Sequence, residues 1–249
     1  MHVASYLNRI GLESVSSTDL STLTTLQQQH MLHVPFENLD VMRGVPITLD
    51  VRDYYEKVIQ HHRGGFCYEL NGLFHWLLKA LGFQNKLISA IVRASETSWA
   101  KEDSHATQIV TLGNESYLVD VGFGDSARIP LPLSGEPRED VSGIHRIYQI
   151  SEEQYDLETQ SENGQWKTLF RFNTDEKALA DFQAGCDFNQ HSPDSHFTQK
   201  DLVTIATKDG RITLSGDELT ITSQNEKQKS IVTPDSRATI LEKHFGIRL

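Results

Sequence analysis

The sequence predicts an α+β protein made of two or three structural units. Helical periodicity dominates the first eighty or so residues, short segments rich in Val, Ile and Tyr follow from about residue 85, and a capped helical pattern closes the chain. Helices gathered in one stretch and strands in the next are typical of α+β proteins. With 249 residues, 38% of them hydrophobic, the chain can bury one sizeable core or several small ones.

Two helices are expected before residue 63. Ser17 or Thr18 is the expected N-cap of the first, in which leucines recur at helical spacing until Pro35 ends the pattern. Asp50 is the expected N-cap of the second, over residues 51–62, because its apolar residues follow the stripe of an amphipathic helix. Both patterns predict helices with one buried face.

A third helix is expected over residues 67–83, and it is the clearest element of the chain. Leucine and phenylalanine recur three and four residues apart along one face, and Gly82 supplies the C-terminal stop. A glycine pair, Gly64-Gly65, directly precedes this helix. Cys67 is therefore expected at or near its first turn.

From about residue 85 the pattern changes to that of strands. The segments are short, rich in β-branched and aromatic residues, and divided by turn residues, which predicts an antiparallel sheet or a small barrel. They cover residues 84–94, 106–124, 145–151 and 154–160. Further on, Asp209-Gly210 and Gly216-Asp217 are expected as hairpin turns, and residues 234–249 as a capped closing helix.

Composition and charge exclude several classes of protein. The 23 Lys and Arg face 34 Asp and Glu, and the resulting net charge of -11 is spread along a chain without the basic cluster that nucleic-acid binding needs. No stretch approaches the roughly 18 apolar residues of a membrane-spanning helix. The N-terminus lacks the pattern of a secretory signal. We therefore expect a cytoplasmic protein without nucleic-acid or membrane partners.

Cys67 has the setting of a reactive thiol. The free N–H groups and partial positive charge at a helix N-terminus favour thiolate over thiol, and the preceding glycines allow a substrate close to the backbone. The alternative is a small buried hydrophobe beside an ordinary turn. Only two cysteines occur in a chain without an export signal, so no disulfide framework is expected. Cys186 has no helix start and no clear base nearby, so we expect an inert thiol.

His105 and Asp120 supply the partners that a catalytic thiolate needs. Acyl transfer requires an imidazole to exchange protons and an acid to hold its tautomer. If Gly113-Asn114 forms a two-residue hairpin loop, position 107 lies opposite Asp120. His105 and Asp120 then share a face as diagonal neighbours, roughly 7 to 8 Å apart at the backbone. A three-residue loop without a compensating bulge would place them on opposite faces, and a single strand histidine is more often structural than catalytic.

The other groups of polar residues in the sequence do not predict a functional site. The remaining histidine pairs lack the spacing of known ligand sets, so neither a catalytic nor a structural metal site is expected. The VDVGFGDS segment lacks the spacing of a phosphate loop and by itself predicts a turn after a strand. Glu37, Asn38 and Arg63 are expected to form a buried structural network.

Four motifs together resemble those of the arylamine N-acetyltransferases and follow the order of that family. They are PFENLDV at 35–41, RGGFCYELNGLF at 63–74, VDVGFG at 119–124 and HSPDSHF at 191–197. The terminal EKHFGIRL is similar to the closing helix of bacterial members. The resemblance implies a helical bundle, a central antiparallel β-barrel and an α/β lid, arranged as in papain-like and transglutaminase-like cysteine enzymes. The corresponding domains are 1–84, 85–190 and 191–249.

The resemblance also implies a reaction. Cys67 carries over as nucleophile, His105 as base and Asp120 as the orienting acid, with acetyl-CoA as donor and no metal. The acceptor would be the nitrogen of an arylamine or arylhydrazine, or the oxygen of an N-hydroxyarylamine. Acetyl would rest on the cysteine between donor and acceptor, which makes the mechanism ping-pong.

Four further residues carry over as substrate contacts. Phe36 and Phe123 would line the acceptor pocket, although plain core packing explains them equally well. Gly124 would lie beside CoA, and Thr207 would reach it from the lid. The alternatives to this function are a transglutaminase-like cysteine acyltransferase or peptidase acting on proteins, and an inactive binding module that keeps the fold.

Overall fold

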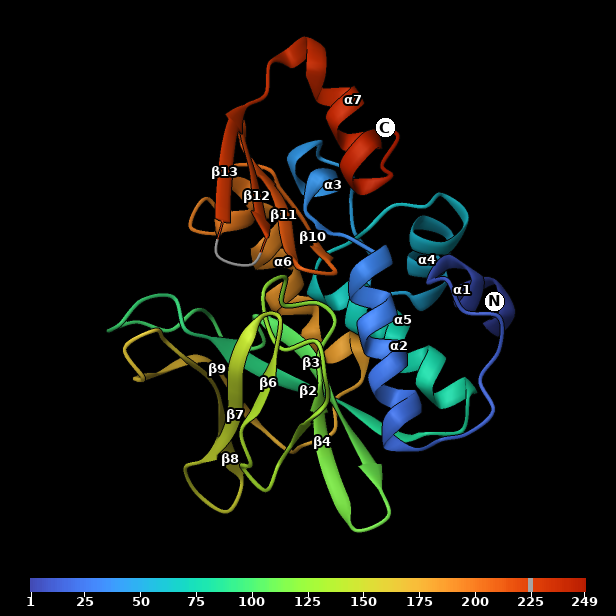
Figure 1. Ribbon diagram of the computed structural model, residues 1–249, viewed down its shortest axis with the longest axis vertical. Helices are drawn as coiled ribbons and strands as arrows, with labels where there is room; N and C mark the ends of the chain where they lie inside the picture. Colours follow the sequence, from blue (N-terminus) through green and yellow to red (C-terminus); the bar gives the residue numbers. More distant parts are fainter. Residues whose placement is uncertain (224–225) are drawn as a thin grey trace.

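The computed structural model describes residues 1–223 and 226–249 and arranges them in three parts (Figure 1). Helices from the first eighty residues lie together beside a strongly curved sheet, and a second sheet with the C-terminal helix lies at the other end. The N-terminal helices are α1 (Val3–Arg9), α2 (Leu20–His33), α3 (Leu39–Met42), α4 (Val51–Tyr55) and α5 (Cys67–Ala80). The division into domains 1–84, 85–190 and 191–249 stays a prediction.

The helix starts differ in one detail from the sequence prediction. Asp19, rather than Ser17 or Thr18, caps α2, because its Oδ1 accepts from the Thr22 N–H at 2.8 Å. A carboxylate at this place also interacts favourably with the positive end of the helix. Asp50 caps α4 as expected, and that helix continues as one π-helical stretch over Glu56–Gln60.

The central sheet has eight antiparallel strands in the order β5-β4-β3-β2-β9-β8-β7-β6 and curls into a nearly closed barrel. The expected strands are confirmed, and β5, β6 and β9 are strands that the sequence did not predict. The burial pattern of β9 does not alternate regularly, and β5 and β6 are only two and three residues long. The bounds are β2 (Gln84–Val92), β3 (His105–Leu112), β4 (Glu115–Val119), β5 (Leu131–Pro132), β6 (Arg138–Asp140), β7 (Gly143–Gln149), β8 (Gln154–Gln160) and β9 (Trp166–Asn173).

The second sheet combines residues from both ends of the chain. The short strand β1 (Phe36–Glu37) pairs with β10 (Leu202–Thr207), and the order is β1-β10-β11-β12-β13. The predicted closing helix is α7 (Pro234–Phe245), which ends before the predicted residue 249 because Gly246 takes a left-handed conformation, and its apolar face packs on this sheet. The remaining strands are β11 (Gly210–Ser215), β12 (Glu218–Ser223) and β13 (Glu226–Ile231).

The first hairpin turn of this sheet lies one residue earlier than predicted. Lys208 and Asp209 form the loop, and Gly210 already pairs with Thr207 as the first residue of β11. A Cβ on Gly210 would lie 1.9 Å from the Thr222 carbonyl oxygen. This glycine therefore serves close approach between strands. The second turn, Gly216-Asp217, is where the sequence places it.

A helix before the lid was not expected. Helix α6 (Gln183–His191) contains Cys186, and it follows directly from the 3₁₀ turn Leu179–Phe182. The start of α6 is inconspicuous in the sequence because its N-cap is Phe182, whose side chain cannot accept a hydrogen bond from the helix. A further 3₁₀ turn covers His196–Thr198. Throughout the described ranges, no helix combines the length and the apolar character needed to cross a membrane.

The buried residue His30 predicts acid sensitivity. Its Nδ1 pairs with the Tyr6 hydroxyl at 2.7 Å, and its Nε2 has no hydrogen-bond partner among the residues described. Burial, with Arg9 and His33 nearby, lowers the pKa of His30 to about 3. The unfolded chain, with a histidine pKa of about 6.5, therefore binds more protons between these values, and stability falls as the pH is lowered.

We expect this histidine to cost up to about 4 kcal/mol of unfolding free energy between pH 6.5 and 3. Urea denaturation at a series of pH values measures the slope. The variant His30→Asn should flatten it, whereas His33→Asn, on the exposed end of the same helix, should not. An unchanged slope in His30→Asn would contradict the assignment.

Candidate active site

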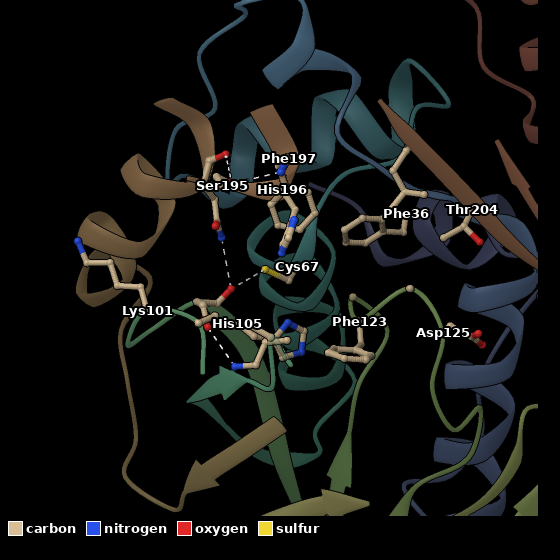
Figure 2. A pocket seen from close by; sticks show the side chains of 18 of the residues that line it. Phe36, Cys67, Lys101, His105, Phe123, Asp125, Ser195, His196, Phe197 and Thr204 are labelled. Atoms are coloured by element: carbon tan, nitrogen blue, oxygen red, sulfur yellow. Dashed lines mark hydrogen bonds between the residues drawn. The ribbon is translucent and has the colours of Figure 1, made fainter. Parts of the chain in front are cut away.

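Cys67 is the first residue of α5, as the sequence predicts. The helix start is fixed by the N3 residue Glu69, whose Oε2 accepts from the Phe66 N–H at 3.0 Å. The Cys67 side chain is 3% exposed, and its Sγ lies 3.8 Å from the Ser104 carbonyl oxygen. The thiol is therefore held at the positive end of a helix, beside the strand that carries the predicted base (Figure 2).

His105 and Asp120 meet as the hairpin register requires. Strands β3 and β4 are joined by the two residues Gly113-Asn114, and Gln108 pairs with Val119, so position 107 does face Asp120. The His105 Nε2 lies 2.5 Å from the Asp120 Oδ2, and both side chains are buried. The second ring nitrogen, Nδ1, is thereby left for Cys67, whose side chain is among the groups that raise the pKa of this imidazole.

The electrostatics of the three side chains act in one direction. Burial alone would lower the pKa of His105, but the Asp120 carboxylate and the Cys67 side chain outweigh it and raise this pKa to about 10. Burial would likewise raise the pKa of Asp120, whereas His105 and two further donors lower it. At neutral pH the imidazole is therefore a cation between a carboxylate and the sulfur.

Asn71 completes the arrangement and was not identified from the sequence. Its Nδ2 donates to the Asp120 Oδ1 at 3.0 Å and to the Ala106 carbonyl at 2.7 Å, and its Oδ1 accepts from the Val121 N–H at 3.0 Å. The spacing along the sequence could have identified Asn71. It follows Cys67 by four residues and so lies on the same face of α5.

A glycine at position 122 lets the loop after Asp120 lie close to α5. Its N–H donates to the Asp120 Oδ1 at 2.8 Å. A Cβ at this position would lie 2.7 Å from the Asn71 Nδ2 and 2.9 Å from the Cys67 Cα. Only a residue without a side chain lets the loop approach α5 closely enough to make these bonds.

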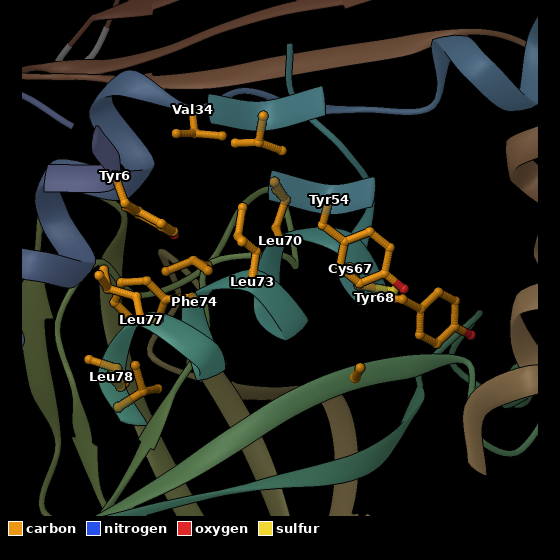
Figure 3. Packing of buried hydrophobic residues seen from close by; sticks show 14 of the residues in the cluster. Tyr6, Val34, Tyr54, Cys67, Tyr68, Leu70, Leu73, Phe74, Leu77 and Leu78 are labelled. Carbon is orange, nitrogen blue, oxygen red and sulfur yellow. The ribbon is translucent and has the colours of Figure 1, made fainter. Parts of the chain in front are cut away.

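Helix α5 is a rigid support for the thiol because it is buried on nearly all sides. Figure 3 shows Leu70, Leu73, Phe74 and Leu77 packed inside the helical part of the molecule, to the left of Cys67. All four side chains are fully buried. Displacement of the sulfur would disturb a large apolar core, so the position of the Cys67 thiol is tightly determined.

Cys67 and His105 border a cavity of about 600 Å³. Three of the predicted contact residues, Phe36, Phe123 and Gly124, also line it, whereas Asp120 lies behind His105. Thr207 is not part of the lining, and its carbonyl accepts from a buried arginine. The structure thus brings together five of the predicted residues around one space and places Thr207 outside it.

The cavity also has lining residues that sequence reasoning missed. They come from the β2–β3 loop, α6, the HSPDSHF segment and the β10–β11 hairpin, and include Trp99, Lys101, Phe188, His196, Phe197, Thr204 and Arg211. The ring of Phe197 lies 5.9 Å from that of Phe36. Of these residues, the sequence pointed only to those in the HSPDSHF motif. The others could not be found from sequence spacing, because these segments meet through tertiary contacts.

The polar network around Arg63 agrees with the structural role expected for it. Its Nε donates to the Glu37 Oε1 at 2.8 Å, and its Nη2 pairs with Asp40 at 2.9 Å. Asn38 donates to the Phe197 and Lys200 carbonyls and so ties β1 to the lid segment. Within residues 1–223 and 226–249, no group of three or more His, Cys, Asp or Glu side chains is arranged to hold a metal ion.

Comparison with known proteins identifies the family of this chain. A family model described as N-acetyltransferase matches residues 19–249. The chain is 31% identical to the arylamine N-acetyltransferase of Mycolicibacterium smegmatis, over 100% of this chain and 93% of the relative. It is 32% identical to the arylamine N-acetyltransferase pineal gland isozyme NAT-10 of Gallus gallus, over 92% and 86%. The chain belongs to the arylamine N-acetyltransferase family.

Solved structures of arylamine N-acetyltransferases have the same fold. The Salmonella typhimurium enzyme superposes with a TM-score of 0.93 at 28% identity, over 98% of this chain and 90% of the other. The Bacillus cereus enzyme, which has a unique Cys-His-Glu catalytic triad, gives 0.92 at 29% identity over 98% of both chains. In the present chain the acid beside His105 is an aspartate.

Membership of the arylamine N-acetyltransferases confirms the resemblance, the α+β fold with its barrel, and the enzyme class predicted from the sequence. The alternative of a transglutaminase-like acyltransferase or peptidase acting on proteins is not favoured by these relatives. An inactive binding module is not favoured either, because His105 and Asp120 form their contact beside Cys67.

Proposed function

We propose that this protein moves the acetyl group of acetyl-CoA to the nitrogen of an arylamine or arylhydrazine, with Cys67 as nucleophile, His105 as base and Asp120 as orienting acid. The same acetyl-enzyme would serve the oxygen of an N-hydroxyarylamine. The observation that carries the proposal is the 2.5 Å contact of His105 with Asp120 beside a thiol at a helix start. The cavity of about 600 Å³ over the thiol has room for an aromatic acceptor.

In the first half-reaction the Cys67 sulfur attacks the thioester carbonyl carbon. A new C–S bond forms, the bond to the CoA sulfur breaks, and that sulfur takes the proton from the His105 imidazolium. One thioester replaces another, so the free energy of this step is close to zero. The backbone N–H of Cys67 is in the first turn of α5 and has no acceptor within the helix, so it is free to donate to the oxyanion that develops on the attacked carbonyl.

In the second half-reaction the amine nitrogen attacks the acetyl carbon held on Cys67. Neutral His105 takes the proton from the amine, the C–S bond breaks, and the amide leaves together with restoration of the thiolate and imidazolium. Asp120 stabilises the positive charge that forms on His105. An aromatic amine suits this route because its low basicity keeps it unprotonated at neutral pH.

The acceptor contacts follow from the lining of the cavity. Phe123 packs edge-on against the His105 ring at 5.4 Å, and Phe36 borders the same end of the space. Both residues also pack in the core, so structural and binding roles combine. Gly124 lines the cavity with a φ of 91°, and its contact with CoA stays a prediction, as does that of Thr207. The cytoplasmic location also stays a prediction.

The kinetic order of the reaction tests this proposal. Incubation with acetyl-CoA alone should place one acetyl group on the protein, detected by intact mass and lost on addition of an arylamine. Initial rates should give parallel lines in double-reciprocal plots of the two substrates, because acetyl rests on Cys67 between them. Intersecting lines without an acetyl adduct would indicate direct transfer in a ternary complex and contradict the proposal.

A further inference from the structure

Arg128 lies just beyond the loop that carries Asp120 and is 5% exposed. Its guanidinium donates to three acceptors on two different parts of the protein. Nη1 donates to the Thr207 carbonyl at 2.5 Å, Nη2 to the Gly210 carbonyl at 2.6 Å, and Nε to the Ser142 hydroxyl at 2.8 Å. None of these acceptors touches the triad.

The three bonds join the tip of the lid hairpin to the barrel. Thr207 and Gly210 are the pair that flanks the turn between β10 and β11. Ser142 lies in the turn between β6 and β7, and its N–H donates to Asp140 at 2.6 Å. Asp140 also accepts from the Arg128 backbone N–H at 2.5 Å. One side chain thereby holds two hairpins in fixed relation.

The hairpin held in this way forms one wall of the active-site cavity. Thr204, Arg211 and Thr213 line the cavity from β10 and β11. In Figure 2, Thr204 and Asp125 lie beyond Phe36 and on the same side of Cys67. A Cβ on Gly124 would lie only 3.5 Å from the Thr204 Cγ2, so this wall closely approaches the loop after Asp120.

The charges at this joint explain why the residue is an arginine. Arg128 lies near a second buried guanidinium, that of Arg211, whose Nε pairs with Asp125 at 3.0 Å. Burial, and next to it the Arg211 charge, lower the pKa of Arg128. A planar guanidinium can donate to three separate acceptors at once, whereas a lysine ammonium is a compact point charge on a flexible stem.

We propose that Arg128 is a positioning residue for the arylamine acceptor: by fixing the β10–β11 hairpin against the barrel, it sets the width of the cavity end that Phe36 and Phe123 border. It touches no substrate and has no part in acetylation of Cys67. Its loss lets the wall move and weakens acceptor binding, while the thiol and its partners stay in place. This role rests on the proposed acetyl transfer to arylamines.

The test separates the two half-reactions. 4-Nitrophenyl acetate acetylates the thiol without any CoA contact, because the sulfur displaces 4-nitrophenolate from the ester. 4-Methoxyaniline then removes the acetyl group. In Arg128→Lys and Arg128→Met we expect KM for 4-methoxyaniline to rise at least about tenfold, with the rate constant for 4-nitrophenolate release changed by less than about twofold. The matched control is Arg138→Met, an arginine whose pair with Glu136 is solvent-exposed.

A second measurement distinguishes positioning from general destabilisation. Guanidinium chloride at millimolar concentration should lower KM in Arg128→Ala by occupying the vacated site, and should leave the wild-type KM unchanged. If Arg128→Met fails to fold, Arg128→Lys decides. An unchanged KM in a folded variant, or equal losses in both half-reactions, would overturn the role of Arg128. A wild-type protein that accepts acetyl on Cys67 but does not pass it to the amine would instead overturn the proposed function.

Discussion

Replacement of Cys67 by serine or alanine is expected to lower kcat/KM for acetylation of an arylamine by at least about a thousandfold. Alanine removes the atom on which acetyl must rest. Serine offers a hydroxyl that is far harder to ionise than a thiol, and it turns a balanced exchange of thioesters into formation of an ester that the weakly basic amine attacks slowly. Steady-state assays with acetyl-CoA and 4-methoxyaniline measure the loss.

The matched control is the other cysteine of the chain. Cys186 is buried in α6, and its sulfur accepts from the Gln190 Nε2 at 3.2 Å. Burial raises the pKa of Cys186 to about 12, so this thiol stays protonated and inert. Cys186→Ala should keep activity within about twofold of the wild type. A dead Cys186→Ala variant with an active Cys67→Ala variant would show that the site is assigned to the wrong cysteine.

The substitution Asp120→Asn is expected to lower kcat/KM about 10³- to 10⁴-fold without loss of the fold. The Asn71 Nδ2 and the Gly122 N–H both donate to the Asp120 Oδ1, so this position must remain an oxygen. The new amide nitrogen then faces the His105 Nε2, which is forced to accept a hydrogen bond. The ring proton moves to Nδ1, on the Cys67 side, and His105 cannot act as base.

The pH dependence of Cys67 alkylation also tests the pairing of Cys67 with His105. Because Asp120 and Cys67 raise the pKa of His105 to about 10, the imidazolium accompanies the sulfur across the neutral range. Inactivation of the wild type by iodoacetamide should stay fast as the pH is lowered through the neutral range, because the imidazolium charge remains beside the sulfur. In Asp120→Asn the charge that outweighs burial is gone, so His105 becomes neutral and the reaction slows near pH 6.

The apparent value from such a profile belongs to the coupled pair rather than to one residue. The profile itself still decides between two arrangements. A wild-type rate that rises only above pH 8 would mean an ordinary thiol and would contradict the ion pair, even in a protein with this fold. Cys186→Ala serves as the alkylation control, because it leaves Cys67 as the only thiol of the chain.

Local chemistry accounts for what could be predicted from the sequence. The glycine pair and the apolar stripe place Cys67 at a helix start, and the helix is there. The Gly113-Asn114 loop determines the register of β3 and β4, and with it the meeting of His105 with Asp120. Both inferences depend on neighbours close in sequence, where periodicity and turn geometry act directly.

By itself, then, the sequence determined most helices, most strands and the family, and it singled out Cys67, His105 and Asp120, which the structure brings together. Only the tertiary structure decided how Asn71 and Gly122 orient Asp120, and how Arg128 holds the lid hairpin. These contacts join segments far apart along the chain, and the pairing of β1 with β10 is another of them. Propensity and spacing carry no information on such pairs, because the distances between distant segments are set by the packing of the whole core.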